Sequence, residues 1–140
     1  MDIKSLQNQI IEEFSVFEDW MDKYAYLIEL GNELDDLDEQ YKTDQNLIQG
    51  CQSKVWFHAE YKDGKIIYKA DSDAIITKGI ASLLIRVLSN QAPQEIIDSD
   101  LFFIEKIGIQ QHLSPTRSNG LLAMIKQMKL YAMAFQSVNK

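Results

Sequence analysis

The fold of this chain is decided by residues 55–70, which read Val-Trp-Phe-His-Ala-Glu-Tyr-Lys-Asp-Gly-Lys-Ile-Ile-Tyr-Lys-Ala. Apolar residues recur at every second position over 55–61 and again over 66–70, which is the pattern of a strand with one buried face. The Lys-Asp-Gly-Lys stretch between them is typical of a tight hairpin turn. We therefore predict an antiparallel hairpin, and residues 46–49 are candidates for a short third strand beside it.

The loop before the hairpin carries the only cysteine of the chain, Cys51. Its neighbours Gln49, Gln52 and Ser53 are polar, whereas a cysteine buried as a small hydrophobe usually has apolar neighbours. Gly50 permits a positive φ, so a tight loop at one end of the sheet can present the thiol. A thiol is a nucleophile only as thiolate, which a helix N-terminus or a nearby cation stabilises. From this pattern alone, a reactive thiol and an inert one both stay open.

Helical periodicity precedes the hairpin. Apolar stripes predict one helix over residues 3–14 and a second that ends at Gly31. Ser15 followed by Glu18 forms a capping box, which predicts the start of the second helix. The polar stretch 32–44 is expected to be a connection with one short helical turn.

Helical periodicity also follows the hairpin. The Asp-Ser-Asp cluster at 71–73 predicts the N-cap of a broadly apolar helix over 74–90. Gly79 costs that helix about 1 kcal/mol relative to alanine, which indicates close packing against a neighbour. Pro93 predicts the first turn of a short helix, and 101–107 is another short apolar segment.

The last predicted helix covers residues 118–137 and follows a polar segment at 111–120. Arg117 lies at or before the N-terminus of this helix, where a cation opposes the helix dipole. This misfit suggests that Arg117 holds an anionic group, although a surface arginine with a solvated head remains the alternative. Taken together, helices, a hairpin and more helices predict an α+β fold with a small antiparallel sheet packed against helices, in a single domain over residues 1–140.

The composition excludes several classes of function. The formal net charge is −7, which argues against nucleic acid and against anionic membrane surfaces as partners. The acidic run at 33–39 is expected to be a solvated face. A single cysteine excludes an internal disulfide and a multi-thiolate metal site, and no cofactor or metal site is expected. Without a secretory signal or a membrane-spanning apolar stretch, we expect a soluble cytoplasmic protein.

Five blocks of the sequence, taken in their order and spacing, carry a family resemblance. They are Trp20 with Lys23-Tyr24 and 28–31; 48–53 with Val55-Trp56; 71–74 with Lys78-Gly79; 93–96; and 111–113 with Pro115, Arg117, 120–121 and 123–125. These blocks resemble the SufE family, the sulfur-acceptor partners of cysteine desulfurases. The resemblance covers residues 14–134, and the blocks together are specific although each alone is weak.

The resemblance implies roles for five residues. Cys51 would accept the sulfur as a persulfide. Gln52 and Ser53 would shape the loop around it. Asp73 would cap the central helix or restrain the loop, and Arg117 would stabilise the thiolate or persulfide anion.

The resemblance also implies partners. A SufS-type cysteine desulfurase would donate the sulfur and be stimulated, and iron–sulfur scaffold proteins would receive it. The fold is expected to resemble that of the scaffold IscU, but one cysteine argues against building a cluster on this chain alone. We expect an accessory sulfurtransferase-type protein that acts with the desulfurase and has no independent activity. The oligomeric state stays open, with a homodimer among the options.

The sequence departs from the family pattern in places and leaves rivals open. The turn at 62–65 is tighter, residues 101–105 are shorter and lack a tryptophan, and Thr116 stands where serine is familiar. One rival is a cysteine hydrolase that pairs Cys51 with His58 or His112, which would need an imidazole within hydrogen-bond reach. The other is a regulatory module that activates a desulfurase without carrying sulfur.

Overall fold

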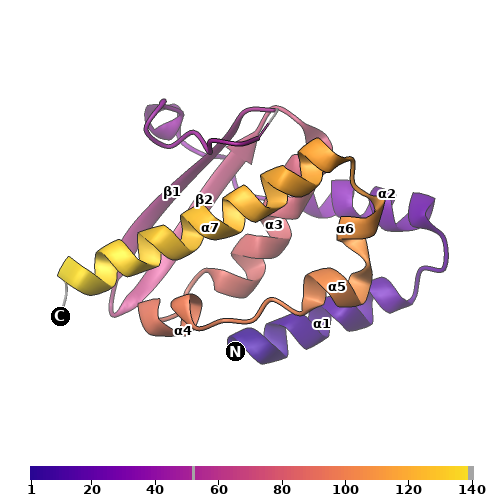
Figure 1. Cartoon of the computed structure of the whole chain (residues 1–140), viewed down its shortest axis with the longest axis horizontal. Helices are drawn as coiled ribbons and strands as arrows, with labels where there is room; N and C mark the ends of the chain where they lie inside the picture. Colours follow the sequence, from indigo (N-terminus) through magenta and orange to yellow (C-terminus); the bar gives the residue numbers. More distant parts are fainter. Residues whose placement is uncertain (52, 139–140) are drawn as a thin grey trace.

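The computed structural model describes residues 1–51 and 53–138. In chain order the elements are α1 (Ile3–Ser15), α2 (Trp20–Asn32), the short 3-10 helix η1 (Glu39–Tyr41), β1 (Val55–Lys62), β2 (Lys65–Ser72), α3 (Ile75–Leu88), α4 (Pro93–Ile97), α5 (Phe103–Ile107), α6 (Ile109–His112) and α7 (Pro115–Val138). The hairpin lies at one side of the molecule, and α7 runs in front of it (Figure 1). The predicted α+β class is confirmed.

The sheet of the described chain is the predicted hairpin. β1 and β2 pair antiparallel from Val55↔Ser72 to Lys62↔Lys65, and the turn has positive φ at Asp63 (54°) and Gly64 (80°). The predicted third strand is wrong, because residues 46–49 contribute only an isolated bridge, Leu47↔Trp56. Two backbone hydrogen bonds accompany that bridge, from Ile48 N–H to the Val55 carbonyl and from Phe57 N–H to the Asn46 carbonyl, which is too short a pairing to make a strand.

The centre of the fold is α3, which contacts β2, α1, α2 and α7. A Cβ at Gly79 would lie 2.5 Å from the Leu27 carbonyl oxygen, and one at Gly31 would lie 2.8 Å from the Gly79 nitrogen. The backbones of α2 and α3 therefore touch at their glycines, which confirms the packing predicted for Gly79. Gly31 lies inside α2, which ends one residue later than predicted.

The predicted start of α2 is wrong. Ser15 is the last residue of α1, and its hydroxyl donates to the Glu12 carbonyl at 2.6 Å. The cap is Asp19, whose carboxylate accepts from the Met21 backbone N–H at 2.8 Å. Two helices in close succession offer several polar residues that can cap, and local spacing alone does not choose among them.

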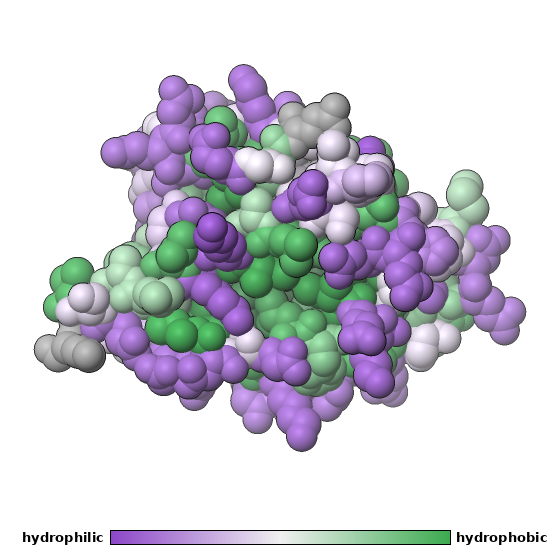
Figure 2. All heavy atoms as spheres, viewed as in Figure 1, coloured by the Kyte–Doolittle hydropathy of each residue, from purple (hydrophilic) through white to green (hydrophobic). Residues whose placement is uncertain are grey.

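The space-filling view shows how hydrophobic residues are distributed on one face of the molecule. Hydrophilic residues line most of its rim, and hydrophobic residues gather toward the centre (Figure 2). In the described residues, no helix combines the length and apolar character needed to cross a membrane.

Candidate functional site

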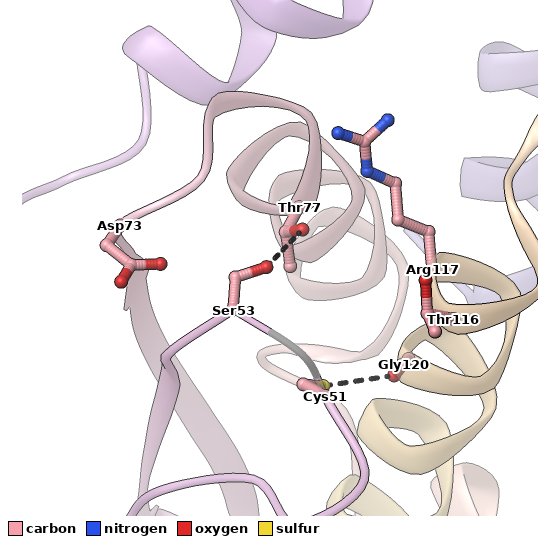
Figure 3. Close-up of a pocket in the computed structure, with 7 residues that line it drawn as sticks. All are labelled: Cys51, Ser53, Asp73, Thr77, Thr116, Arg117 and Gly120. Atoms are coloured by element: carbon pink, nitrogen blue, oxygen red, sulfur yellow. Dashed lines mark hydrogen bonds between the residues drawn. The ribbon is translucent and has the colours of Figure 1, made fainter.

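Cys51 lies on the loop that enters β1, at the end of the hairpin where β2 leads into α3 (Figure 3). Gly50 has a φ of +97°, a conformation that L side chains rarely adopt. This confirms the positive φ that the sequence predicted for Gly50. Cys51 is half-buried, and it is a free cysteine in a chain that has no second one.

The Cys51 loop packs on small residues of α7. The thiol donates a hydrogen bond to the Gly120 carbonyl, with 3.6 Å between sulfur and oxygen. A Cβ at Gly120 would lie 3.2 Å from the Cys51 sulfur, and one at Gly50 would lie 3.4 Å from the Ala123 Cβ. The absence of a side chain at Gly120 therefore makes room for the thiol against the helix backbone.

A cavity of about 340 Å³ lies beside the thiol. It is lined by Cys51, Ser53, Asp73, Thr77, Thr116, Arg117 and Gly120. The structure thus brings together four of the five predicted site residues, which come from the Cys51 loop, the connection between β2 and α3, and the first turn of α7. The fifth, Gln52, lies outside the described residues.

Three lining residues had no predicted role. Thr77 is buried, and its hydroxyl lies 3.4 Å from that of Ser53. Thr116 and Gly120 come from the first turns of α7. Gly120 could have been found from sequence, because a glycine within a helical pattern indicates close packing, as it did at Gly79.

Asp73 restrains the loop. Its carboxylate accepts from the Lys54 backbone N–H at 3.0 Å, and its own N–H donates to the Lys54 carbonyl at 3.1 Å. The predicted cap by residues 71–73 is wrong, because α3 begins after Ala74 without a side-chain cap. Of the two roles expected for Asp73, the restraint is the one that the contacts support.

Arg117 belongs to the first turn of α7, which begins three residues earlier than predicted. Its backbone N–H donates to the Ser114 hydroxyl at 3.4 Å. The side chain is exposed, and its guanidinium forms none of the ion pairs found among the described residues. In Figure 3 it extends along the cavity away from the Cys51 sulfur.

Burial raises the pKa of the Cys51 thiol above its ordinary value. Removing a thiol from water disfavours the thiolate, and no cation among the described residues offsets this in the resting structure. Cys51 is therefore a protonated thiol near neutral pH. A protonated thiol is the less reactive form of a cysteine.

The two histidines lie elsewhere. The ring of His58 stacks on Tyr41 with centroids 3.7 Å apart, and its Nε2 lies 3.1 Å from Glu60. The ring of His112 stacks on Trp20. Among the described residues that line the cavity there is no histidine, so this geometry does not provide the base that a cysteine hydrolase needs. The described part of the chain also holds no cluster of three or more metal-ligating side chains.

Comparison with known proteins assigns the family. Residues 8–132 match SufE, described as an Fe-S metabolism associated domain. The chain belongs to the SufE family. It is 39% identical over 128 residues to an uncharacterized SufE-like protein of Synechocystis sp., an alignment that covers 91% of this chain and 80% of that relative. Membership supports a role in iron–sulfur metabolism.

A solved structure shares the fold. The solution structure of a hypothetical protein from Thermus thermophilus superposes with a TM-score of 0.78 and covers 94% of this chain and 96% of its own. The two sequences are 19% identical, so this likeness concerns the fold alone.

Proposed function

We propose that this SufE-family protein is a sulfur acceptor that receives a persulfide sulfur on Cys51 from a cysteine desulfurase and delivers it to iron–sulfur cluster assembly. The observation that carries the proposal is the position of Cys51. It is the only cysteine, on a glycine-shaped loop beside a cavity that also contains Arg117. Family membership supports the link to iron–sulfur metabolism.

The proposed reaction is a thiol exchange at sulfur. The Cys51 thiolate attacks the terminal sulfur of the desulfurase persulfide, and a new sulfur–sulfur bond forms as the old one breaks. The desulfurase cysteine leaves as a thiolate, so no external oxidant or reductant is required. Exchange of this kind depends on the thiolate fraction and on access to the sulfur.

Because burial raises the pKa of Cys51, binding of the desulfurase would be needed to expose and deprotonate the thiol. In the free protein the thiol is protonated and packed on Gly120, which protects it from oxidants. Docking would move the loop away from Gly120, and the thiol proton would pass to solvent or to a basic group of the desulfurase. A loop between rigid elements suits such a movement.

Arg117 and the cavity would accommodate and stabilise the persulfide formed on Cys51. A persulfide carries one more sulfur than the thiol and is an anion when ionised, and the cavity of about 340 Å³ offers room for it. The Arg117 guanidinium, with no carboxylate partner among the described residues, is available to pair with that anion. Ser53 and Asp73 would hold the loop through their contacts with Thr77 and Lys54.

The direct test is the intact mass of the protein after incubation with an active desulfurase and cysteine, without reductant. The expected result is a gain of one sulfur atom that maps to Cys51 and is reversed by a thiol reductant. Cys51→Ser should gain none while unfolding at a similar denaturant concentration. Full sulfur gain on Cys51→Ser would refute the proposal.

The resting state of Cys51 also favours a second candidate, a regulatory module that activates the desulfurase without carrying sulfur. A packed, protonated thiol is what an inert cysteine would show. Desulfurase turnover in the presence of Cys51→Ala separates the two. Activation equal to that of the wild type would favour the regulatory module, and lost activation with retained binding would favour the carrier.

A further inference from the structure

A group of side chains on α2 holds the end of α6. The ring of His112, the last residue of α6, stacks on the Trp20 indole with centroids 3.8 Å apart and an interplanar angle of 25°. The Tyr24 hydroxyl donates a hydrogen bond to the His112 carbonyl. The Lys23 ammonium lies 4.9 Å from the centre of the Trp20 ring. One turn of α2 therefore contacts His112 through both its ring and its backbone.

The chain between His112 and Arg117 is short and has its own hydrogen bonds. The Ser114 hydroxyl accepts from the Arg117 backbone N–H at 3.4 Å, as the cap of a helix N-terminus does. Gln110 of α6 donates to the Ser118 hydroxyl of α7 at 3.1 Å. A displacement of His112 would therefore be passed to the first turn of α7, which lies beside α6 in Figure 1.

Arg117 depends on this backbone for its position. Its side chain is exposed and has many rotamers, and none of the described carboxylates forms an ion pair with it. The fold therefore fixes the backbone of Arg117, in the first turn of α7, and this sets the region that the guanidinium can reach. Arg117 lines the cavity together with Cys51, and it does so from the first turn of α7, which starts at Pro115.

We propose that Tyr24 and His112 are positioning residues that hold the junction of α6 and α7, so that the Arg117 side chain stays in the cavity that Cys51 also lines. The importance of this for sulfur transfer rests on the proposed function. The positioning itself can be measured with small reagents and no desulfurase.

The test compares two disulfide reagents that attack the same thiol. Dithiobis(nitrobenzoate) is anionic and dithiodipyridine is neutral, and with either one the Cys51 thiolate forms a mixed disulfide and releases an aromatic thiolate. The measured quantity is the second-order rate constant for the anionic reagent divided by that for the neutral reagent. Positive charge near Cys51 raises this ratio, and changes in the thiolate fraction cancel because both reagents attack the same thiolate. The ratio should fall in Arg117→Gln and should fall at high salt in the wild type.

Tyr24→Phe should lower the ratio in the same direction, by at most the factor lost in Arg117→Gln, because the effect passes through Arg117. Tyr26→Phe is the matched control, since its hydroxyl also leaves α2 but donates to Glu13. That variant should keep the wild-type ratio. His112→Phe retains a ring to stack on Trp20 and should also keep it, whereas His112→Ala should lower it.

The double variant Tyr24→Phe with Arg117→Gln decides whether the effect passes through Arg117. The ratio should fall no further than in Arg117→Gln alone, because residues that act through one group are not additive. A wild-type ratio in Tyr24→Phe, a further fall in the double variant, or no fall in Arg117→Gln would each overturn the positioning role. Sulfur gain on wild-type Cys51 is measured separately, so failure of the carrier function would be recognised independently.

Discussion

Gly120→Ala changes the thiol environment by one methyl group. The new Cβ would lie 3.2 Å from the Cys51 sulfur and 3.8 Å from its Cα and Cβ. Only the first contact is tighter than ordinary van der Waals packing, so the sulfur must move by a few tenths of an ångström. The movement lengthens the 3.6 Å contact with the Gly120 carbonyl and exposes the thiol.

Two effects on stability oppose each other. Alanine in place of glycine favours a helix by about 1 kcal/mol, and the displaced sulfur costs about the same through overpacking. The net change in the free energy of unfolding should therefore be close to zero. In a Cys51→Ala background the sulfur is absent and the remaining contacts are ordinary, so Gly120→Ala should stabilise that variant by about 1 kcal/mol.

The assays are urea unfolding of the four proteins in this cycle and the rate of alkylation of Cys51 by iodoacetamide at pH 7. Alkylation of Gly120→Ala should be faster than that of the wild type by up to about tenfold, because less burial lowers the pKa of the thiol and each pKa unit is tenfold in thiolate. Equal stabilisation in both backgrounds, together with an unchanged alkylation rate, would show that Gly120 does not make room for the thiol.

The remaining predictions concern pH and packing. Burial raises the pKa of Cys51, so the stability that the protonated thiol contributes is complete below the unfolded pKa of about 8.5 and is lost as pH rises through the folded pKa. Urea unfolding of the wild type and of Cys51→Ser at pH 7 and pH 10 should show this loss. An equal difference in stability between the two proteins at both pH values would contradict it. The Arg86 hydrogen bonds to Glu13 lower the pKa of that carboxyl, so Glu13→Gln should cost about 1–2 kcal/mol at pH 7. The difference should fade as pH falls below about 4, and urea titrations at pH 7 and pH 3.5 check it. Gly79→Ala places a Cβ 2.5 Å from the Leu27 carbonyl oxygen and should destabilise by about 3 kcal/mol, measured by urea unfolding; wild-type stability would rule out a rigid contact between α2 and α3.

Sequence patterns predicted the elements better than their ends. The alternation over 55–70 identified the hairpin, since each strand must turn one face to the core. The predicted helix ends were wrong where several nearby polar residues could each cap the helix, as at Ser15 and Asp19. The prediction of a third strand was wrong, because residues 46–49 form only one isolated bridge with β1.

The candidate site was only partly accessible from sequence. Cys51 was conspicuous as the only cysteine in a polar loop after Gly50, and the family resemblance pointed to Ser53, Asp73 and Arg117. The roles assigned to all five site residues, Cys51, Gln52, Ser53, Asp73 and Arg117, remain predictions. Thr77 gave no signal, because its hydroxyl faces Ser53 only once α3 packs beside the loop.

By itself the sequence determined the strand pairing, the existence of the principal helices, the single cysteine in a polar loop and the family, because these depend on local periodicity, on residue identity and on matched blocks. Only the tertiary structure decided that Gly120 underlies the thiol, that burial raises the pKa of Cys51, and that Tyr24 contacts the segment leading to Arg117. These three facts depend on burial and on contacts between residues distant in the chain. Such contacts exist only after the helices have packed around the hairpin.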